Sequence, residues 1–207
     1  MRGLSTQAPA ENTPVSKRSS EPSFALFQTF EEEPLQEMLA EAKRFADAVI
    51  TSPWEGAYCL SLLGRSGNGK TMLARCILSA LKVNAHGTSD VIAERIDRGR
   101  FIRFECQFRD WRKVSEKLKN GEWGVVDAME EPQLLVLDDI GADYDPNSIA
   151  AGKLDRLLRA RSGKWTVLTS NLSLAEINTR MDGRIASFLI RDRNRWTEVS
   201  TKDFWVR

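Results

Sequence analysis

The segment that most constrains this chain is GRSGNGKT, which runs from Gly64 to Thr71. It matches the phosphate-binding pattern G-x-x-x-x-G-K-[ST] at every position, with an apolar run before it and apolar residues at helical spacing after it. Glycines let backbone N–H groups curl closely around phosphate oxygens, because they lack the Cβ that would block the approach. The helix that follows points the positive end of its dipole at the same anion. The segment therefore predicts a nucleotide-phosphate site between a strand and a helix.

Two side chains of this segment have chemical roles of their own. We expect Lys70 to neutralise the β- and γ-phosphates of ATP and Thr71 to offer its hydroxyl to Mg²⁺. A glycine-rich turn that only connects a strand to a helix is the plainer alternative, but the complete pattern in its correct setting argues against it. The residues expected to contact the nucleotide are Gly64, Ser66, Gly67, Asn68, Gly69, Lys70 and Thr71.

Further along the chain, four apolar residues at 134–137 are followed by Asp138 and Asp139. This pattern is typical of a buried strand whose carboxyl end enters the ligand site of an open α/β sheet. We expect Asp138 to hold Mg²⁺, directly or through water, and Asp139 to polarise the attacking water as general base. Strands often end in polar turns, so the acidic pair gains its meaning from the phosphate-binding segment upstream.

A third polar group, Thr169-Ser170-Asn171, follows another apolar run. The amide of Asn171 is placed to contact the γ-phosphate or to orient the attacking water. The alternative is that Asn171 caps the helix that follows.

Apolar and polar residues alternate along the chain in a β–α order. This order predicts an α/β domain with a parallel sheet between helices. The expected strands are 58–63, 101–106, 134–137 and 165–169, and the expected helices are 34–50, 71–81, 110–119, 149–161 and 173–189. Residues 83–100 are polar and predict a surface loop or an irregular insertion. Residues 1–23, rich in Ser, Pro and Thr, predict a disordered tail before a domain that spans 24–207.

Composition excludes several classes of protein. The net charge of +1 gives no reason to expect a polyanion partner, although basic residues concentrate in the last third of the chain. Three scattered cysteines and a single histidine argue against a zinc site and fit reduced thiols in the cytoplasm. No apolar stretch is long enough to span a membrane or to serve as a signal peptide.

Four segments together carry a resemblance to a known group of proteins. They are Gly64–Thr71, Leu134–Ala142 with the sequence LLVLDDIGA, Thr169–Ser173 with TSNLS, and Asp182–Ser187 with DGRIAS. This series resembles the AAA+ ATPases of the DnaC/DnaI bacterial helicase loaders and, equally, the related IstB transposition helpers. The phosphate-binding pattern is shared by all P-loop proteins, whereas the second and third segments are more specific to this group. The resemblance extends from about Phe24 to Arg207.

The resemblance implies a P-loop NTPase core of the AAA+ type: a parallel five-stranded sheet sandwiched by helices, with a reduced or absent C-terminal lid. It also implies a homo-oligomer that holds ATP and Mg²⁺ at its subunit interfaces and binds single-stranded DNA. Asn171 takes the sensor position of the group, and Arg207 lies in a segment like its terminal sensor-2 region. The group places a trans-acting arginine finger where this chain has Phe188. Arg184 is our candidate substitute, with Arg191 as the alternative.

Two basic segments are candidate DNA contacts. In the first, Trp111 is flanked by cations and would stack on a base if it were exposed. The favoured alternative is an amphipathic helix that buries Trp111, Val114 and Leu118 beneath a solvated basic face. The cations of the first segment are Arg109, Arg112, Lys113, Lys117 and Lys119; the second segment holds Arg191, Arg193, Arg195 and Trp196.

The expected function is ATP-dependent loading or remodelling of a replicative DnaB-type helicase on single-stranded DNA. An IstB-like helper that binds duplex DNA and a transposase is the first alternative. A small-molecule kinase is a second, and the lack of an Arg-rich lid motif argues against it. Phe188 keeps a third alternative open, a DNA-binding scaffold that binds ATP but scarcely hydrolyses it.

Overall fold

The structure, a computed structural model, describes residues 22–27, 32–81, 91–97, 100–143, 145 and 147–200. Strands and helices alternate along most of this part of the chain. The strands are β1 (Cys59–Gly64), β2 (Val91–Asp97), β3 (Arg100–Asp110), β4 (Leu134–Ile140), β5 (Trp165–Ser170) and β6 (Arg195–Val199). The α-helices are α1 (Glu33–Thr51), α2 (Lys70–Ala80), α3 (Trp111–Lys119), α4 (Ile149–Ala160), α5 (Leu174–Arg180) and α6 (Gly183–Leu189). Short 3₁₀ helices span Phe24–Phe27, Trp123–Val125 and Asp127–Met129.

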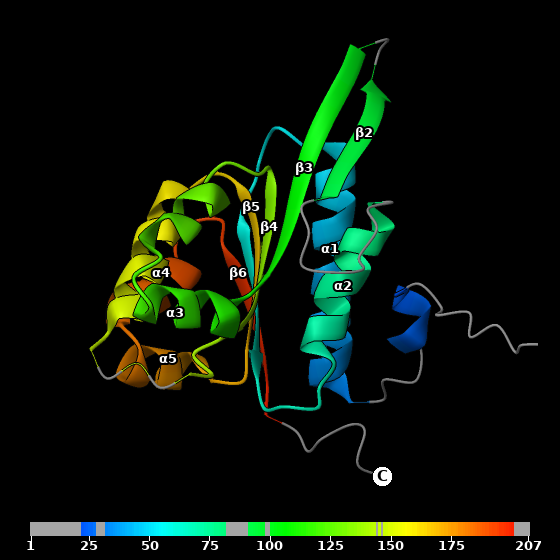
Figure 1. The fold of residues 1–207 in the computed structure, drawn as a ribbon. Coiled ribbons are helices and arrows are strands. Elements are labelled where there is room, and N and C mark those ends of the chain that lie inside the picture. The colour runs from blue at the N-terminus through cyan, green and yellow to red at the C-terminus, as the bar shows by residue number, and fades with distance from the viewer. Residues whose placement is uncertain are drawn as a thin grey trace, which may run out of the picture.

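The strands form one sheet in the order β2-β3-β4-β5-β1-β6 (Figure 1). Neighbours from β3 to β6 pair in parallel, and β2 pairs antiparallel with β3 at the edge. Because parallel strands share one carboxyl edge, β1, β4 and β5 bring the three predicted polar segments to the same end of the sheet. The expected five-stranded parallel sheet is confirmed, and β2 adds a sixth strand to it.

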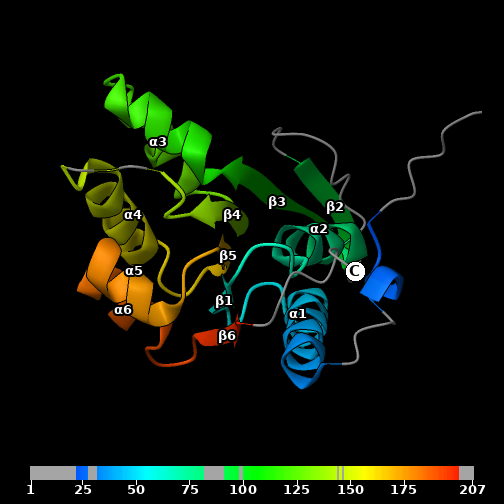
Figure 2. The same ribbon diagram turned by 90° about the horizontal axis from the view of Figure 1, so that it is seen from below.

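Helices cover both faces of the sheet, as the β–α order predicts. Figures 1 and 2 show α1 and α2 on one face and α3 to α6 on the other. Each face has its own apolar core, with Phe45 and Ile77 fully buried on the first and Trp111 and Leu158 on the second. All six residues of β1 are buried, which is typical of a parallel strand covered on both sides.

The sequence prediction of residues 83–100 as a loop is wrong for the residues described. Strand β2 pairs with β3 from Val91↔Cys106 to Asp97↔Arg100, and Figure 1 shows the two strands reaching beyond the helical layers. The hydrogen bonds of this pair are made between backbones, so a polar composition does not reveal them. Strand β6 was also missed, because it is short and has exposed residues at Arg195 and Trp196. Residues 82–90 and 98–99 lie outside the described residues.

The single helix expected over 173–189 is two helices. The first, α5, starts with the predicted capping box, in which Ser173 and Glu176 each accept a hydrogen bond from the other's backbone N–H. It ends at Arg180. Asp182 then has an extended backbone and accepts a hydrogen bond from the backbone N–H of Arg184, so it caps a new helix, α6. Apolar spacing continues through the break, which is why periodicity alone did not show it.

The proposed tail of residues 1–23 falls almost entirely outside the described residues, so the boundary at residue 24 remains a prediction. No helix in the described part of the chain is both long and apolar enough to cross a membrane.

Candidate nucleotide-binding site

The phosphate-binding segment forms a tight loop between β1 and α2. Gly64 has φ +108°, and a Cβ at this position would lie 2.0 Å from the carbonyl oxygen of Val199 at the end of β6. That same carbonyl accepts hydrogen bonds from the Arg65 backbone N–H at 3.1 Å and from Asn68 Nδ2 at 3.3 Å. The start of the loop is therefore held against β6, and only glycine fits at position 64.

Phe27 supports the other end of the loop. Gly69 has φ +75°, and a Cβ there would lie 2.7 Å from the ring of Phe27. The Phe27 side chain is 1% exposed. The short N-terminal helix thus packs directly on the residue before Lys70. The sequence showed an apolar cluster around Phe27, but not that it contacts the phosphate-binding loop.

Lys70 lies within the curl of its own loop. Its side chain is buried, and its Nζ donates to the carbonyl oxygen of Arg65 at 2.5 Å. This arrangement places the ammonium group among the backbone atoms that are expected to surround the phosphates.

Thr71 and Asp138, the two expected Mg²⁺ ligands, are in direct contact. Thr71 Oγ1 donates to Asp138 Oδ1 at 2.8 Å, and Thr169 Oγ1 donates to the same oxygen at 2.6 Å. The described residues contain no group of three or more His, Cys, Asp or Glu side chains arranged around one ion. An oxygen pair of this kind fits Mg²⁺, which commonly takes one or two carboxylates and completes its shell with water and phosphate oxygens.

Asp139 has an unusual backbone that turns its side chain into the site. Its φ is +61°, and the pairing of β4 with β5 shifts register between Leu137 and Ile140. Two contacts hold this conformation: the Asp139 N–H donates to Thr169 Oγ1 at 2.9 Å, and Asn171 Nδ2 donates to Asp139 Oδ1 at 2.8 Å. A left-handed non-glycine residue is costly, and such strain is often found at functional positions.

Burial and neighbouring charges raise the pKa of Asp139. Partial desolvation is the largest cause, and the negative charge of Asp138 adds to it, while Arg112 and Lys70 act in the opposite direction. A carboxylate with a raised pKa is a better proton acceptor, which suits the role of general base.

The alternative interpretation of Asn171 as a helix cap is wrong, because Ser173 caps α5. The amide of Asn171 instead orients the carboxylate of Asp139.

These groups line one pocket of about 480 Å³ at the carboxyl edge of the sheet. Four lining residues were not predicted to belong to this site: Met72, Arg75, Asp110 and Arg112, the last of which was a candidate DNA contact instead. Two signals were available, since Arg75 follows Thr71 by one helical turn and Asp110 begins the helix expected over 110–119. In the sheet, Asp110 is the direct neighbour of Asp138. The full lining is Ser66, Gly67, Gly69, Lys70, Thr71, Met72, Arg75, Asp110, Arg112, Asp138, Asp139, Thr169 and Asn171.

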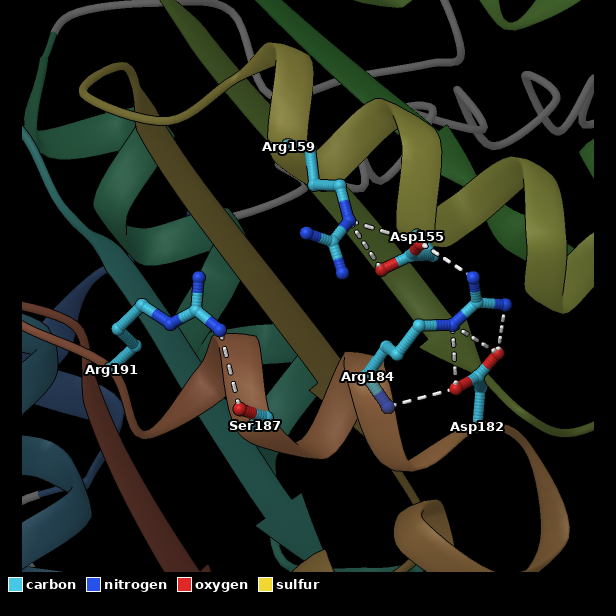
Figure 3. A network of polar contacts seen from close by, with 6 residues as sticks. All are labelled: Asp155, Arg159, Asp182, Arg184, Ser187 and Arg191. Carbon is cyan, nitrogen blue, oxygen red and sulfur yellow. Dashed lines mark hydrogen bonds and ion pairs between the residues drawn. The ribbon is translucent and has the colours of Figure 1, made fainter.

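The two candidate finger arginines are not among the residues that line this pocket; Figure 3 shows them around α6. Arg184 Nη2 lies 2.7 Å from Asp182 Oδ2, and its Nη1 lies 3.8 Å from Asp155 Oδ2. Arg191 Nη2 donates to Ser187 Oγ at 3.5 Å. Phe188 is partly buried against the core beneath α6. The position of Arg207 lies outside the described residues.

The less favoured interpretation, in which Trp111 stacks on a base, is wrong, because its side chain is 0% exposed. The favoured alternative is confirmed: Trp111, Val114 and Leu118 face the core, and Lys113 on the same helix is exposed. In the C-terminal basic set, Trp196 is 43% exposed and Arg195 lies 4.0 Å from Glu41 on α1.

The order of strands, the loop between β1 and α2, and the acidic end of β4 together define a P-loop α/β fold. No protein-family model matches the sequence, and no curated protein matches it either. Solved structures do match. A DnaC helicase loader aligns with a TM-score of 0.63 and 20% identity over 89% of this chain and 100% of that chain.

Two further structures show the same fold. DnaI aligns with a TM-score of 0.56 and 18% identity over 87% of this chain and 89% of that chain. The replication initiator DnaA, bound to AMPPCP and single-stranded DNA, aligns with a TM-score of 0.59 and 14% identity over 88% of this chain. This chain spans about half the length of that DnaA, 51%. The likeness establishes that this chain has the AAA+ fold of helicase loaders and replication initiators.

Proposed function

We propose that this chain is a Mg²⁺-dependent ATPase that loads or remodels a replicative helicase on single-stranded DNA. The observation that carries the ATPase part is the contact of Thr71 with Asp138, because it joins the phosphate-binding loop to the acidic strand end inside one pocket. The helicase part is supported by the match to DnaC over that whole chain. The bound nucleotide and single-stranded DNA in the DnaA structure support these two ligands.

In this proposal each residue has one task during hydrolysis. Backbone N–H groups of Gly67 and Gly69 and the ammonium of Lys70 bind the phosphates. Thr71 and Asp138 would hold Mg²⁺, which would supply positive charge to the phosphates. Asn171 orients the carboxylate of Asp139, and this carboxylate accepts a hydrogen bond from the attacking water. The water oxygen bonds to the γ-phosphorus while the bond to the β-phosphate oxygen breaks. The products are ADP and inorganic phosphate, and the water proton passes through Asp139 to solvent.

We further propose that ATP lies at the interface of a homo-oligomer. Arg184 is our candidate for the arginine that a neighbouring subunit contributes. Its side chain is 63% exposed, so the pairing with Asp182 is a surface interaction that a neighbour's phosphate can replace. The three described cysteines are free and buried, in keeping with the reducing cytoplasm in which replication proteins act.

A nucleotide-gated scaffold with weak hydrolysis is a second candidate, favoured by two observations at α6. Phe188 occupies the expected finger position and packs against the core, and Arg184 is paired within its own subunit. An IstB-like transposition helper is the remaining alternative, and it differs from a loader in its partner and its DNA.

A pull-down from lysate, with and without a non-hydrolysable ATP analogue, tests the proposal. We expect the parent chain to recover a hexameric helicase with the analogue present, and Lys70→Ala, the matched control, to recover none. Recovery of a transposase, together with stronger binding of duplex than of single strands at moderate salt, would contradict the loader assignment. Binding of single strands is expected to weaken steeply as salt rises, because phosphate neutralisation releases counterions.

A further inference from the structure

The nucleotide pocket contains two arginines that no motif assigns. Arg75 comes from α2 and Arg112 from the first turn of α3, so they reach the pocket from opposite faces of the sheet. Asp110, Asp138 and Asp139 line the same pocket. Arg184 and Arg191, which Figure 3 shows around α6, are not among the residues that line the pocket.

Arg75 is anchored but keeps hydrogen-bonding capacity. Its guanidinium lies 5.3 Å from the ring centroid of Phe108 on β3, a cation–π contact that fixes the plane of the group. Its Nε is buried and has no hydrogen-bond partner among the described residues. A buried donor of this kind normally has a partner, so an acceptor in the pocket would complete it. Arg75 also follows Thr71 by one turn of α2, on the same side of the helix as the expected Mg²⁺ ligand.

Arg112 is held at the pocket through its backbone. Its N–H donates to Asp110 Oδ1 at 3.0 Å, which caps α3 and fixes where the helix starts. Because Asp110 pairs in the sheet with Asp138, this cap places Arg112 beside the acidic end of β4. The Arg112 residue is exposed and lines the pocket.

The chemistry of these groups suits a phosphoryl group. Three cations, Lys70, Arg75 and Arg112, line the pocket together with three carboxylates, Asp110, Asp138 and Asp139. Guanidinium groups bind phosphate oxygens with two parallel hydrogen bonds, whereas an ammonium acts as a point charge.

We propose that Arg75 and Arg112 act in cis, each binding the terminal phosphoryl group of the nucleotide held by its own subunit. This inference rests on the proposed ATPase function. It adds that Arg75 and Arg112 supply positive charge at the terminal phosphoryl group. It is separate from Arg184, which would act on a neighbour's nucleotide.

Affinity for a transition-state analogue gives a measurement that does not depend on turnover. Calorimetry would compare Mg²⁺·ADP with and without aluminium fluoride, in the parent chain and in Arg75→Ala and Arg112→Ala. We expect the parent to bind the fluoride complex more tightly than ADP alone, and each variant to lose most of that difference. Lys113→Ala is the matched control, because Lys113 is exposed on α3 and does not line the pocket.

Turnover of mixed subunits then separates cis from trans action. Each variant should lose about 100-fold in turnover, and mixing it with Lys70→Ala subunits should restore nothing, because every site then lacks one of its own cations. Arg112→Lys should recover part of the loss if charge at this position is what matters. Rescue by mixing, or parent-like binding of the fluoride complex in both variants, would overturn the inference. If the parent itself fails to bind Mg²⁺·ADP, the proposed function fails and this inference falls with it.

Discussion

The nucleotide pocket and the polar network around α6, which Figure 3 shows, both contain carboxylates. The groups that contact these carboxylates differ between the two regions. In the pocket, hydroxyls of Thr71 and Thr169 donate to Asp138, and the amide of Asn171 donates to Asp139. Around α6, guanidinium groups donate instead: Arg184 to Asp182 and Arg159 to Asp155. The pocket carboxylates are held by neutral donors, while the α6 carboxylates are held by opposite charges.

The pKa values follow this difference. The pKa of Asp139 is raised, chiefly by burial, whereas hydrogen bonds from Arg184 lower the pKa of Asp182. When only neutral donors contact a carboxylate, its negative charge remains available to bind a metal ion or a proton. A carboxylate paired with arginine has its charge already compensated. We therefore propose that the pocket is where the chemistry takes place and that α6 serves support or assembly.

The largest expected effect is at α6 and tests whether its role extends to a neighbouring site. Arg184→Ala should slow hydrolysis by about 10³-fold, the lower end for arginine fingers, because negative charge that develops on the γ-phosphate loses a partner. Mixing Arg184→Ala with Lys70→Ala subunits should restore activity, since a mixed interface pairs an intact loop with an intact arginine. The assay is steady-state ATPase activity at fixed total protein.

Arg191→Ala is the control for that experiment. If only Arg191→Ala loses activity and is rescued by mixing, the finger has been assigned to the wrong residue. If neither variant slows hydrolysis, α6 contributes nothing to catalysis and the scaffold alternative gains.

The second prediction concerns the pocket carboxylates. Asp139→Asn keeps the shape but removes the base, so turnover should fall about 100-fold while ATP still binds. Asp138→Asn, the paired control, should weaken the Mg²⁺-dependent part of ATP binding instead. Turnover at the parent rate in Asp139→Asn would show that the two carboxylates do not have separate roles.

Much of the pocket was predictable because its parts are local in sequence. The loop from Gly64 to Thr71 encodes its own curl, and Asp138 and Asp139 follow their strand directly. The parallel sheet then brings the separate segments to one edge, so the contact of Thr71 with Asp138 follows from the β–α order.

The remaining features depend on contacts between distant segments. Arg75 had one local signal, its position one helical turn after Thr71, but nothing local to Arg112 distinguishes it from other surface arginines. The place of both residues in the pocket comes from the packing of α2 and α3 on the sheet. The same holds for Phe27, which meets Gly69 only in the folded chain, and for the pairing of β2 with β3. Arg184 lies in one of the segments that carry the resemblance, but its pairing with Asp155 and Asp182 was not foreseen.

The third prediction tests the support beneath the loop. Phe27→Ala removes a fully buried ring and should lower the free energy of unfolding by about 2 kcal/mol or more. ATP affinity should fall as well, because Gly69 loses the ring that packs on it. Leu26→Ala is the matched control: Leu26 is 47% exposed, so its effect should stay within about 0.5 kcal/mol. Equal effects of the two variants on denaturant unfolding would argue against a supporting role for Phe27.

The smallest expected effect is at Asp182. Asp182→Asn keeps the helix cap but removes a charge from an exposed pair, so Tm in a thermal melt should change by no more than about 2 °C. A much larger drop would mean that the α6 network is a main source of stability, which contradicts our view of Arg184 as available to a neighbour.

The central claim is that the loop and the acidic pair form a site for Mg²⁺ and ATP, and calorimetric titration of ATP into the parent and Lys70→Ala chains tests it most directly. The parent should bind ATP more tightly with Mg²⁺ than without it. Lys70→Ala should lose about tenfold to a hundredfold in affinity, since it removes a charge-assisted phosphate contact. Unchanged affinity in Lys70→Ala, with the fold intact by circular dichroism, would contradict the claim.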